Sequence, residues 1–197
     1  MHFSTVALFL GLAASSLAAP VSNTANGLGR RAVLQEQSYA DFQISDGQGG
    51  NALQEVNQKF PVSFPSDIEM QSPCFSNQHR SQIADQDPAN VSEEDQDIIS
   101  KARETAEDAE TGSGGFNEQI EAAGEDSDEG KALQVGKIKN KVLKLQLEIM
   151  DLQIKQAQGD DQTDKIAEEQ KKLQENLDQD KEAAGQTSKS VADTFQG

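Results

Sequence analysis

The sequence predicts an all-α fold: a small helical bundle whose central helix has two apolar faces and belongs to an antiparallel helical hairpin, preceded by an irregular N-terminal segment. Two observations predict it. Residues 136–159, GKIKNKVLKLQLEIMDLQIKQAQG, form the most hydrophobic long stretch of an otherwise polar, acidic chain. A glycine and a short polar turn then separate this stretch from a second amphipathic segment.

The central helix is expected to run from about Ala132 to Gln158. Its apolar residues recur at intervals of three and four in two stripes, whose centres lie roughly 140° apart at ~100° per residue. The first stripe is Val135, Ile138, Val142, Leu145, Ile149 and Leu152, and the second is Leu143, Leu147, Met150, Ile154 and Ala157. A two-stranded coiled coil uses only one stripe, so two stripes predict neighbours on two sides.

The other helices of the bundle, expected within residues 92–184, supply those neighbours. After Gly159, a helix capped by Thr163 or Asp161 buries Ile166, Leu173 and Leu177, and the short connection makes the hairpin antiparallel. On the other side, a helix follows Ser92, with acidic residues in its first turn as the helix dipole prefers. Its inner face is Ile98, Ala102, Ala106 and Ala109, and a short helix, FNEQIEAAG, comes next.

Residues 1–18 are predicted to be a secretory signal peptide. Their apolar run, Val6 to Leu12, is shorter than the ~20 residues of a membrane span, and Ser16 and Ala18 suit the small-residue pattern of a signal-peptidase site. The alternative is a buried N-terminal helix. No later segment is apolar enough to cross a bilayer, so we expect a secreted, extracellular product that does not insert into membranes.

Residues 19–31 are expected to be a pro-segment. They are polar, contain glycine and end in Arg30-Arg31, a dibasic pair of the kind that kexin-type proteases cut in flexible stretches. The mature chain would then begin at Ala32. The alternative is that the pair is never cut.

Residues 32–91 are predicted to be irregular, with one short helix from about Asn51 to Phe60 that Pro61 ends. Residues 61–91 contain four prolines and are interpreted as a wrapped loop or a partly disordered connection. At the other end, residues 185–197 are expected to be a flexible tail.

Net charge excludes one class of partner. The chain has 34 acidic and 17 basic residues, and removal of residues 1–31 takes away two arginines, which leaves a charge of −19. Phosphate backbones and anionic membrane surfaces repel such a chain, so we exclude nucleic-acid binding. The acidic excess lies mainly in residues 93–130, whereas residues 131–197 are nearly neutral, which favours packing of these two parts against each other.

No catalytic set emerges from the sequence. Cys74 is the only cysteine, so no internal disulfide is possible, and this residue is either a buried thiol or an intermolecular link. A Cys74–His79 dyad is conceivable, but no partner motif follows it. We therefore predict no catalytic residue and no enzymatic activity.

Metal, cofactor and anion sites are not predicted either. The acidic loop Asp126–Gly130 resembles the start of a calcium loop, but lysines stand where glycine and glutamate are needed, so we interpret it as a solvated turn. The glycines at 47, 49 and 50 lack the lysine of a phosphate-binding loop and indicate a plain turn. Lys137, Lys139, Lys141 and Lys144 are either a patch for an anionic glycan or lipid, or a face that pairs with the acidic 93–110 helix, which we favour.

One modification site is predicted. Asn90-Val91-Ser92 is the only N-glycosylation sequon of the chain, and it lies just outside the expected start of a helix in polar surroundings. Asn90 is therefore a candidate glycosylation site.

Four segments in order carry a family resemblance: YADFQISDGQGGNALQEVNQKFP, ARETAEDAETGSGGFNEQIEAAG, GKIKNKVLKLQLEIMDLQI and DKIAEEQKKLQENL. Together they resemble a family of small secreted proteins of filamentous ascomycete fungi, whose members are commonly candidate effectors without an assigned activity. The resemblance implies a secreted, non-enzymatic interaction protein that acts as an effector or virulence factor on an extracellular or host protein. The alternative is a structural protein of the fungal wall or matrix. In either case we expect a monomer.

Overall fold

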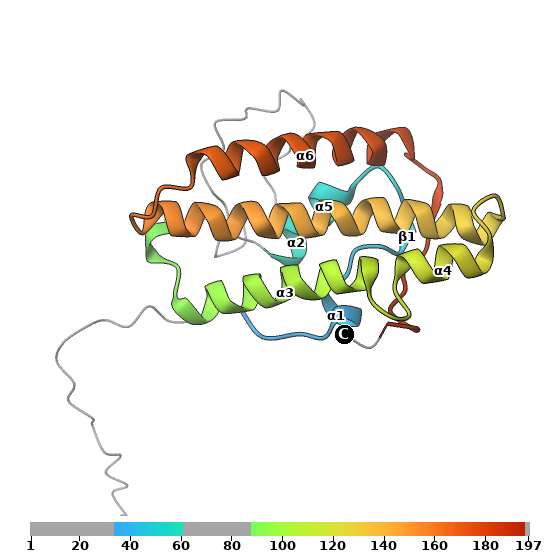
Figure 1. Cartoon of the computed structure of the whole chain (residues 1–197), viewed down its shortest axis with the longest axis horizontal. Coiled ribbons are helices and arrows are strands. Elements are labelled where there is room, and N and C mark those ends of the chain that lie inside the picture. The colour runs from blue at the N-terminus through green and yellow to red at the C-terminus, as the bar shows by residue number, and fades with distance from the viewer. Residues whose placement is uncertain (1–33, 61–87, 196–197) are drawn as a thin grey trace, which may run out of the picture.

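The computed structural model describes residues 34–60 and 88–195. In chain order its elements are α1 (Tyr39–Phe42), β1 (Gly47–Gln48), α2 (Ala52–Lys59), the 3-10 turn η1 (Pro88–Asn90), α3 (Glu93–Thr111), α4 (Phe116–Ala123), α5 (Asp128–Ala157), α6 (Thr163–Glu182) and β2 (Thr187–Ser188). Figure 1 shows α5 as the long central helix, with α6 along one side and α3 and α4 end to end along the other. The predicted all-α bundle with a central helix in an antiparallel hairpin is therefore confirmed.

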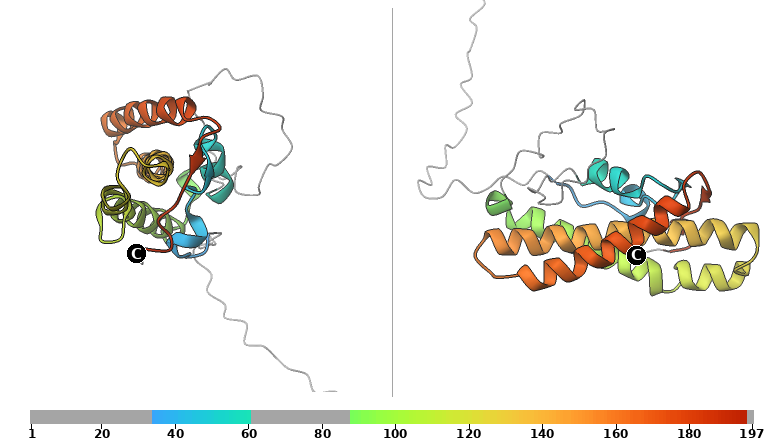
Figure 2. Two further views of the ribbon diagram at one scale, coloured as in Figure 1. Left: turned by 90° about the vertical axis from the view of Figure 1, so that its right-hand side faces the viewer. Right: turned by 90° about the horizontal axis from the view of Figure 1, so that it is seen from above.

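The two apolar stripes of α5 explain its central position. Every residue of those stripes is buried except Ile138, which is half-buried, and Ala157 at the end of the helix, which is exposed. Viewed end-on in Figure 2, α5 is enclosed by α6, by α3 and α4, and on a third side by residues 34–60, which we call the N-terminal arm. The helix thus has the two predicted sets of neighbours and a third that the stripes did not indicate.

Helix α5 begins earlier than the sequence predicted. Its N-cap is Ser127, whose hydroxyl accepts a hydrogen bond from the backbone N–H of Gly130 at 2.9 Å. Asp128 and Glu129 therefore lie in the first turn of the helix, where the helix dipole favours negative charge. Three of the five residues of the predicted acidic loop, 128–130, are helical for this reason.

Helix α3 is rotated slightly from the predicted orientation. Ile99, rather than Ile98, joins Ala102, Ala106 and Ala109 on the buried face, and Ile98 is half-buried at its edge. The two isoleucines are adjacent, and both fit the spacing of three or four residues to the alanines, so periodicity alone did not separate them.

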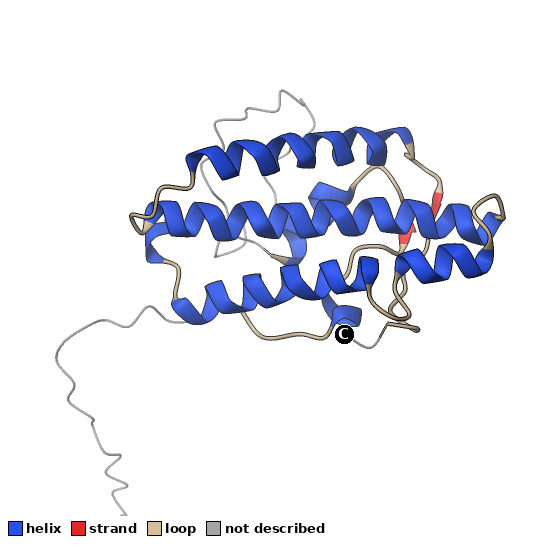
Figure 3. Cartoon of the chain, viewed as in Figure 1, coloured by secondary structure: helices blue, strands red, loops and turns tan. Residues whose placement is uncertain are grey.

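The hairpin partner α6 follows the prediction closely. It starts at Thr163, and its N-cap is Gln162 rather than the predicted Thr163 or Asp161, although the carboxylate of Asp161 accepts the backbone N–H of Thr163 at 3.1 Å. Ile166 and Leu173 are buried and Leu177 is partly buried against the core. Figure 3 shows how little of the described chain is strand: only the short pair formed by β1 and β2.

The C-terminal tail, which was expected to be flexible, is packed against the rest of the protein as far as residue 195. β2 pairs antiparallel with β1, with Gly47 opposite Ser188, and Val191 and Phe195 are buried in the core. The tail crosses α5 at Gly136, where a Cβ atom would collide with the backbone carbonyl of Lys189. Two apolar residues four apart, and a glycine in the central helix to admit the backbone, together fix this segment in place.

The N-terminal arm contains more structure than the single predicted helix. The predicted 51–60 helix is α2, and the one-turn helix α1 precedes it. The ring of Tyr39 packs edge-to-face on Phe42 and Phe195, with centroids 5.6 and 5.4 Å away. Aromatic pairs of this geometry add to the free energy of burying apolar surface, so the arm and the tail share one apolar cluster.

Within the described ranges, none of the helices combines the length and the apolar character that crossing a membrane requires.

Candidate functional site

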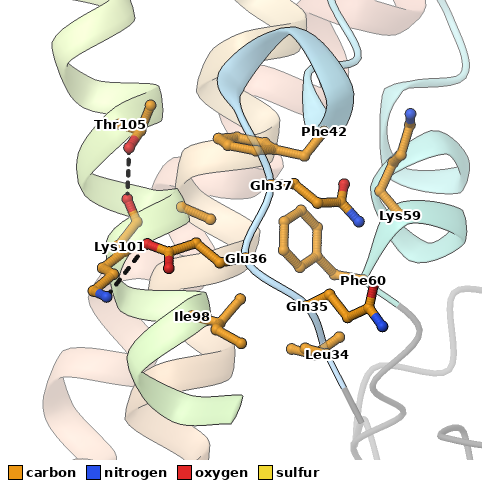
Figure 4. A pocket seen from close by; sticks show the side chains of 11 residues that line it. Leu34, Gln35, Glu36, Gln37, Phe42, Lys59, Phe60, Ile98, Lys101 and Thr105 are labelled. Carbon is orange, nitrogen blue, oxygen red and sulfur yellow. Dashed lines mark hydrogen bonds and ion pairs between the residues drawn. The ribbon is translucent and has the colours of Figure 1, made fainter. Parts of the chain in front are cut away.

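A hollow in the described part of the chain lies between the N-terminal arm and α3, and we call it the arm groove (Figure 4). The apolar part of its lining consists of Leu34, Phe42, Phe60, Ile98 and Ala102, and the polar part consists of Gln35, Glu36, Gln37, Lys59, Lys101 and Thr105. The rings of Phe42 and Phe60 pack edge-to-face at 5.9 Å. The cavity volume is about 80 Å³, far below the roughly 300–1,000 Å³ of ordinary small-molecule pockets. The groove therefore has room for one short side chain and no more.

The rim of the arm groove is polar and solvated. The ammonium of Lys101 lies 3.4 Å from the carboxylate of Glu36, and these side chains are 62% and 73% exposed. On the opposite side, Lys59 donates to the backbone carbonyl of Asp41 at 2.6 Å. Exposed ion pairs contribute about 0–1 kcal/mol, so the rim side chains are free to exchange these contacts for those of a partner.

Asp95 fixes the first residues of the arm beside this groove. Its buried carboxylate accepts the backbone N–H of Leu34 at 2.7 Å and the hydroxyl of Ser92 at 2.8 Å. The S-x-x-D spacing of Ser92 and Asp95 is a helix-start pattern visible in the sequence, but its link to Leu34 is not.

A buried lysine joins the arm to α5. The side chain of Lys139 is wholly buried, and its ammonium lies 2.8 Å from the Glu55 carboxylate. It also donates to the backbone carbonyls of Asp46 and Gln48, at 2.9 and 3.1 Å. All three donor positions of the ammonium therefore have partners in the arm.

The other lysines of this stretch pair with α3, as the charge distribution predicted. Lys137, Lys141 and Lys144 lie 3.9, 3.5 and 3.2 Å from the carboxylate of Glu110. The interpretation of this face as the partner of the acidic helix is confirmed for these three lysines. For Lys139 it is wrong, because that side chain points to the arm instead.

Two further buried polar groups hold the arm. Asp180 of α6 accepts the backbone N–H groups of Gly50 and Ala52, both at 2.9 Å, and so caps α2 from another helix. The hydroxyl of Tyr39 donates to Asn140 at 2.9 Å. Burial raises the pKa of Tyr39 well above its usual range, a nearby carboxylate at Asp46 raises it further, and a hydrogen bond with Ser45 opposes the shift. The tyrosine stays neutral in the folded protein.

Most of the candidate residues from the sequence lie outside the described ranges, namely Ala18, Arg30, Arg31, Cys74 and His79. Asn90 is described: it is the last residue of η1 and is exposed. In the described part of the chain, no group of three or more histidine, cysteine, aspartate or glutamate side chains is placed to hold a metal ion. The described ionisable groups that are most buried, Lys139, Asp180 and Asp95, are engaged in contacts that hold the arm to the bundle.

Those contacts define the class of protein: a helical domain in which an N-terminal arm is held by buried polar side chains against a bundle around one long helix. The chain belongs to the family described as Domain of unknown function (DUF8454), whose sequence profile matches residues 34–192. The match covers the N-terminal arm, the helical bundle and the tail as far as Ala192. No curated protein and no solved structure is significantly similar to the chain.

Proposed function

We propose that this chain is a secreted, non-enzymatic interaction protein of the effector type, which acts by binding an extracellular or host protein. Three observations support the proposal: the signal-type N-terminus, the dibasic pair before the arm, and the resemblance of four segments to small secreted proteins of filamentous ascomycetes. Of these, the export-type N-terminus carries the most weight, because it directs the chain out of the cell.

The structure of the bundle supports a role in binding a protein better than a role in converting a substrate. Its buried ionisable groups already have partners in the arm, whereas the arm groove offers an apolar hollow inside a polar rim. This arrangement is a small version of the apolar centre and polar rim of protein interfaces. A partner would place one short apolar side chain in the groove and polar groups over Glu36 and Lys101.

The test is capture by the tagged mature chain from host extracellular fluid and, separately, from purified fungal wall. Wild type is compared with Glu36→Lys and Lys101→Glu at the groove rim, and with Lys172→Glu on α6 as a matched control for surface charge. We expect one host protein to be recovered by wild type and by the control, and to be lost with the rim variants. Recovery only with wall polysaccharide would reject the effector function and favour a structural wall or matrix protein.

A further inference from the structure

The sequon at Asn90 lies where the chain enters α3. Asn90 is exposed, and within the described ranges its side-chain amide makes no hydrogen bond or ion pair. Val91, the next residue, is only 1% exposed, so the backbone turns inward immediately after the asparagine. An oligosaccharide on Asn90 would therefore extend into solvent without displacing a packed side chain of residues 34–60 or 88–195.

Ser92, the third residue of the sequon, has the opposite environment. It is buried and is the N-cap of α3: its hydroxyl accepts the backbone N–H of Asp95 at 3.1 Å and donates to the carboxylate of Asp95 at 2.8 Å. Both hydrogen-bonding roles of the hydroxyl are therefore in use in the folded protein. A sequon is recognised only with a serine or threonine hydroxyl at this position. In the folded protein this hydroxyl is buried at the start of α3 and hydrogen-bonded to Asp95, so a transferase cannot reach it.

We propose that Asn90 carries an N-linked oligosaccharide, and that it is attached before α3 folds. Ser92 then serves twice, first as the hydroxyl that the transferase recognises and afterwards as the N-cap of α3. The inference rests on the proposed entry of the chain into the secretory pathway, where the transferase acts.

The transfer joins Nδ2 of Asn90 to the anomeric carbon of a lipid-diphosphate-linked oligosaccharide. The bond from that carbon to the diphosphate oxygen breaks, the lipid diphosphate leaves with the electron pair, and the amide loses one proton. No oxidant or reductant is required. In the folded protein the acceptor amide is exposed, but the hydroxyl needed for recognition is not, so the order of folding and transfer decides the outcome.

Four variants separate the two roles of Ser92 in a yeast secretion host. Asn90→Gln removes the acceptor and keeps the cap, Ser92→Asn removes the sequon and keeps a capping side chain, Ser92→Thr keeps both functions, and Ser92→Ala removes both. We expect wild type and Ser92→Thr from the medium to lose mass with an amidase that removes N-linked glycans, and the other three to be unaffected. Compared with Asn90→Gln, Ser92→Ala should melt about 2–4 °C lower through loss of the cap.

The order of events is tested with unglycosylated full-length chain from bacteria, a purified oligosaccharyltransferase and its lipid-linked donor. Folded wild type should remain unmodified, whereas Leu147→Asp, which unfolds the core and leaves the sequon intact, should be glycosylated. Equal modification of both chains would overturn the proposed order. Secreted wild type without a glycan would overturn the site, whereas absence of the chain from the medium and from the secretory lumen would contradict the proposed secretion and this inference with it.

Discussion

The ammonium of Lys139 lies 2.8 Å from the carboxylate of Glu55, although the lysine side chain is wholly buried in the bundle. Removing a charge from water is costly unless a partner and further hydrogen bonds compensate it. Here the compensation comes from Glu55 and two backbone carbonyls, all of which belong to the N-terminal arm. The arm therefore does more than cover apolar surface: it completes the environment of a charged side chain on the central helix.

Replacement of this lysine should destabilise the protein strongly. Lys139→Met keeps most of the side-chain volume but leaves the backbone carbonyls of Asp46 and Gln48 without their donor, and each buried acceptor left without a partner costs about 1–3 kcal/mol. The Glu55 carboxylate, which is 27% exposed, also loses its partner but keeps access to water. Lys172→Met on α6 is the control, because Lys172 makes only exposed ion pairs with Glu168 and Glu169 and should change stability by about 0–1 kcal/mol. Urea unfolding followed by circular dichroism measures both. Equal midpoints for the two variants would contradict the structural role of Lys139.

The capping of α2 by Asp180 leads to a second prediction. Asp180→Ala should cost about 1–3 kcal/mol, chiefly because it leaves the buried backbone N–H of Ala52 without an acceptor. The N–H of Gly50 also loses its acceptor, but Gly50 is exposed and its N–H can turn to water at a smaller cost. Asp180→Asn retains one acceptor oxygen and should cost less. Asp178→Ala, at an exposed neighbouring position, is the control. Hydrogen exchange at Gly50 and Ala52 should accelerate only in the Asp180 variants, and unchanged exchange there would show that α2 is held by other contacts.

The raised pKa of Tyr39 predicts that the folded protein loses stability in alkali. Its pKa is raised in the folded protein, chiefly by burial, whereas an unfolded tyrosine titrates near pH 10. The unfolded state therefore loses its proton first, so the stabilising contribution is complete below about pH 10 and falls as pH rises through the folded pKa. Because Tyr39 is the only tyrosine of the chain, the ultraviolet absorbance of tyrosinate should appear together with unfolding.

Tyr39→Phe is the matched control for this pH dependence. It removes the hydrogen bond to Asn140, so it should be less stable than wild type at neutral pH. Lysines also titrate near pH 10, and their contribution is common to both proteins. Above about pH 10 the urea midpoint of Tyr39→Phe should consequently fall less steeply than that of wild type. Parallel curves would indicate that tyrosine ionisation is not coupled to unfolding.

Secretion in a fungal host should produce a chain that starts at Ala32. Two residues separate the dibasic pair Arg30-Arg31 from the arm, which Asp95 holds through the N–H of Leu34. N-terminal sequencing of the secreted protein measures the start. Replacement of both arginines by glutamine should shift it to about Ala19, the residue after the expected signal cleavage. A wild-type start near Ala19 would show that the pair is not cut.

Repeating local patterns in the sequence predicted the bundle. The stripes of α5 and the apolar face of α6 recur every three or four residues, and such periodicity specifies both a helix and its buried side. Lys139 could not be assigned in this way, because its partners at Asp46 and Gln48 are 93 and 91 residues away in the chain. The packing of the tail was missed for the same reason. Val191 and Phe195 are buried in a tail whose backbone packs directly against Gly136 of α5, and no local pattern in the sequence encodes that contact.

The candidate site was even less accessible to sequence reasoning. The arm groove is assembled from three separate parts of the described chain: residues 34–37, the neighbourhood of Phe42 and Phe60, and α3. Its one local signal was Ile98, which the periodicity placed in the core and the structure places at the groove. An apolar residue next to a helix's buried face is ambiguous until the rotation of the helix is known.

The last prediction concerns the two stripes of α5 and the oligomeric state. Leu145 belongs to the first stripe and Leu147 to the second, and they are 7% and 0% exposed. Because both stripes are covered by other segments of the same chain, Leu145→Ala and Leu147→Ala should each cost about 2–5 kcal/mol, the usual range for a core leucine. Neither cost should depend on protein concentration, since no second copy is needed to bury either side chain.

Thermal melts at several protein concentrations, with light scattering for the mass, test this. Gln146→Ala is the control, because Gln146 lies between the stripes and is half-buried, and its replacement should change stability by about 0.5 kcal/mol or less. A monomer mass for all the variants, with large melting shifts only for the leucine variants, is the expected result. If Leu147→Ala halved the mass and left the melting temperature unchanged, the second stripe would be a subunit interface, and burial of α5 within a single chain would be wrong.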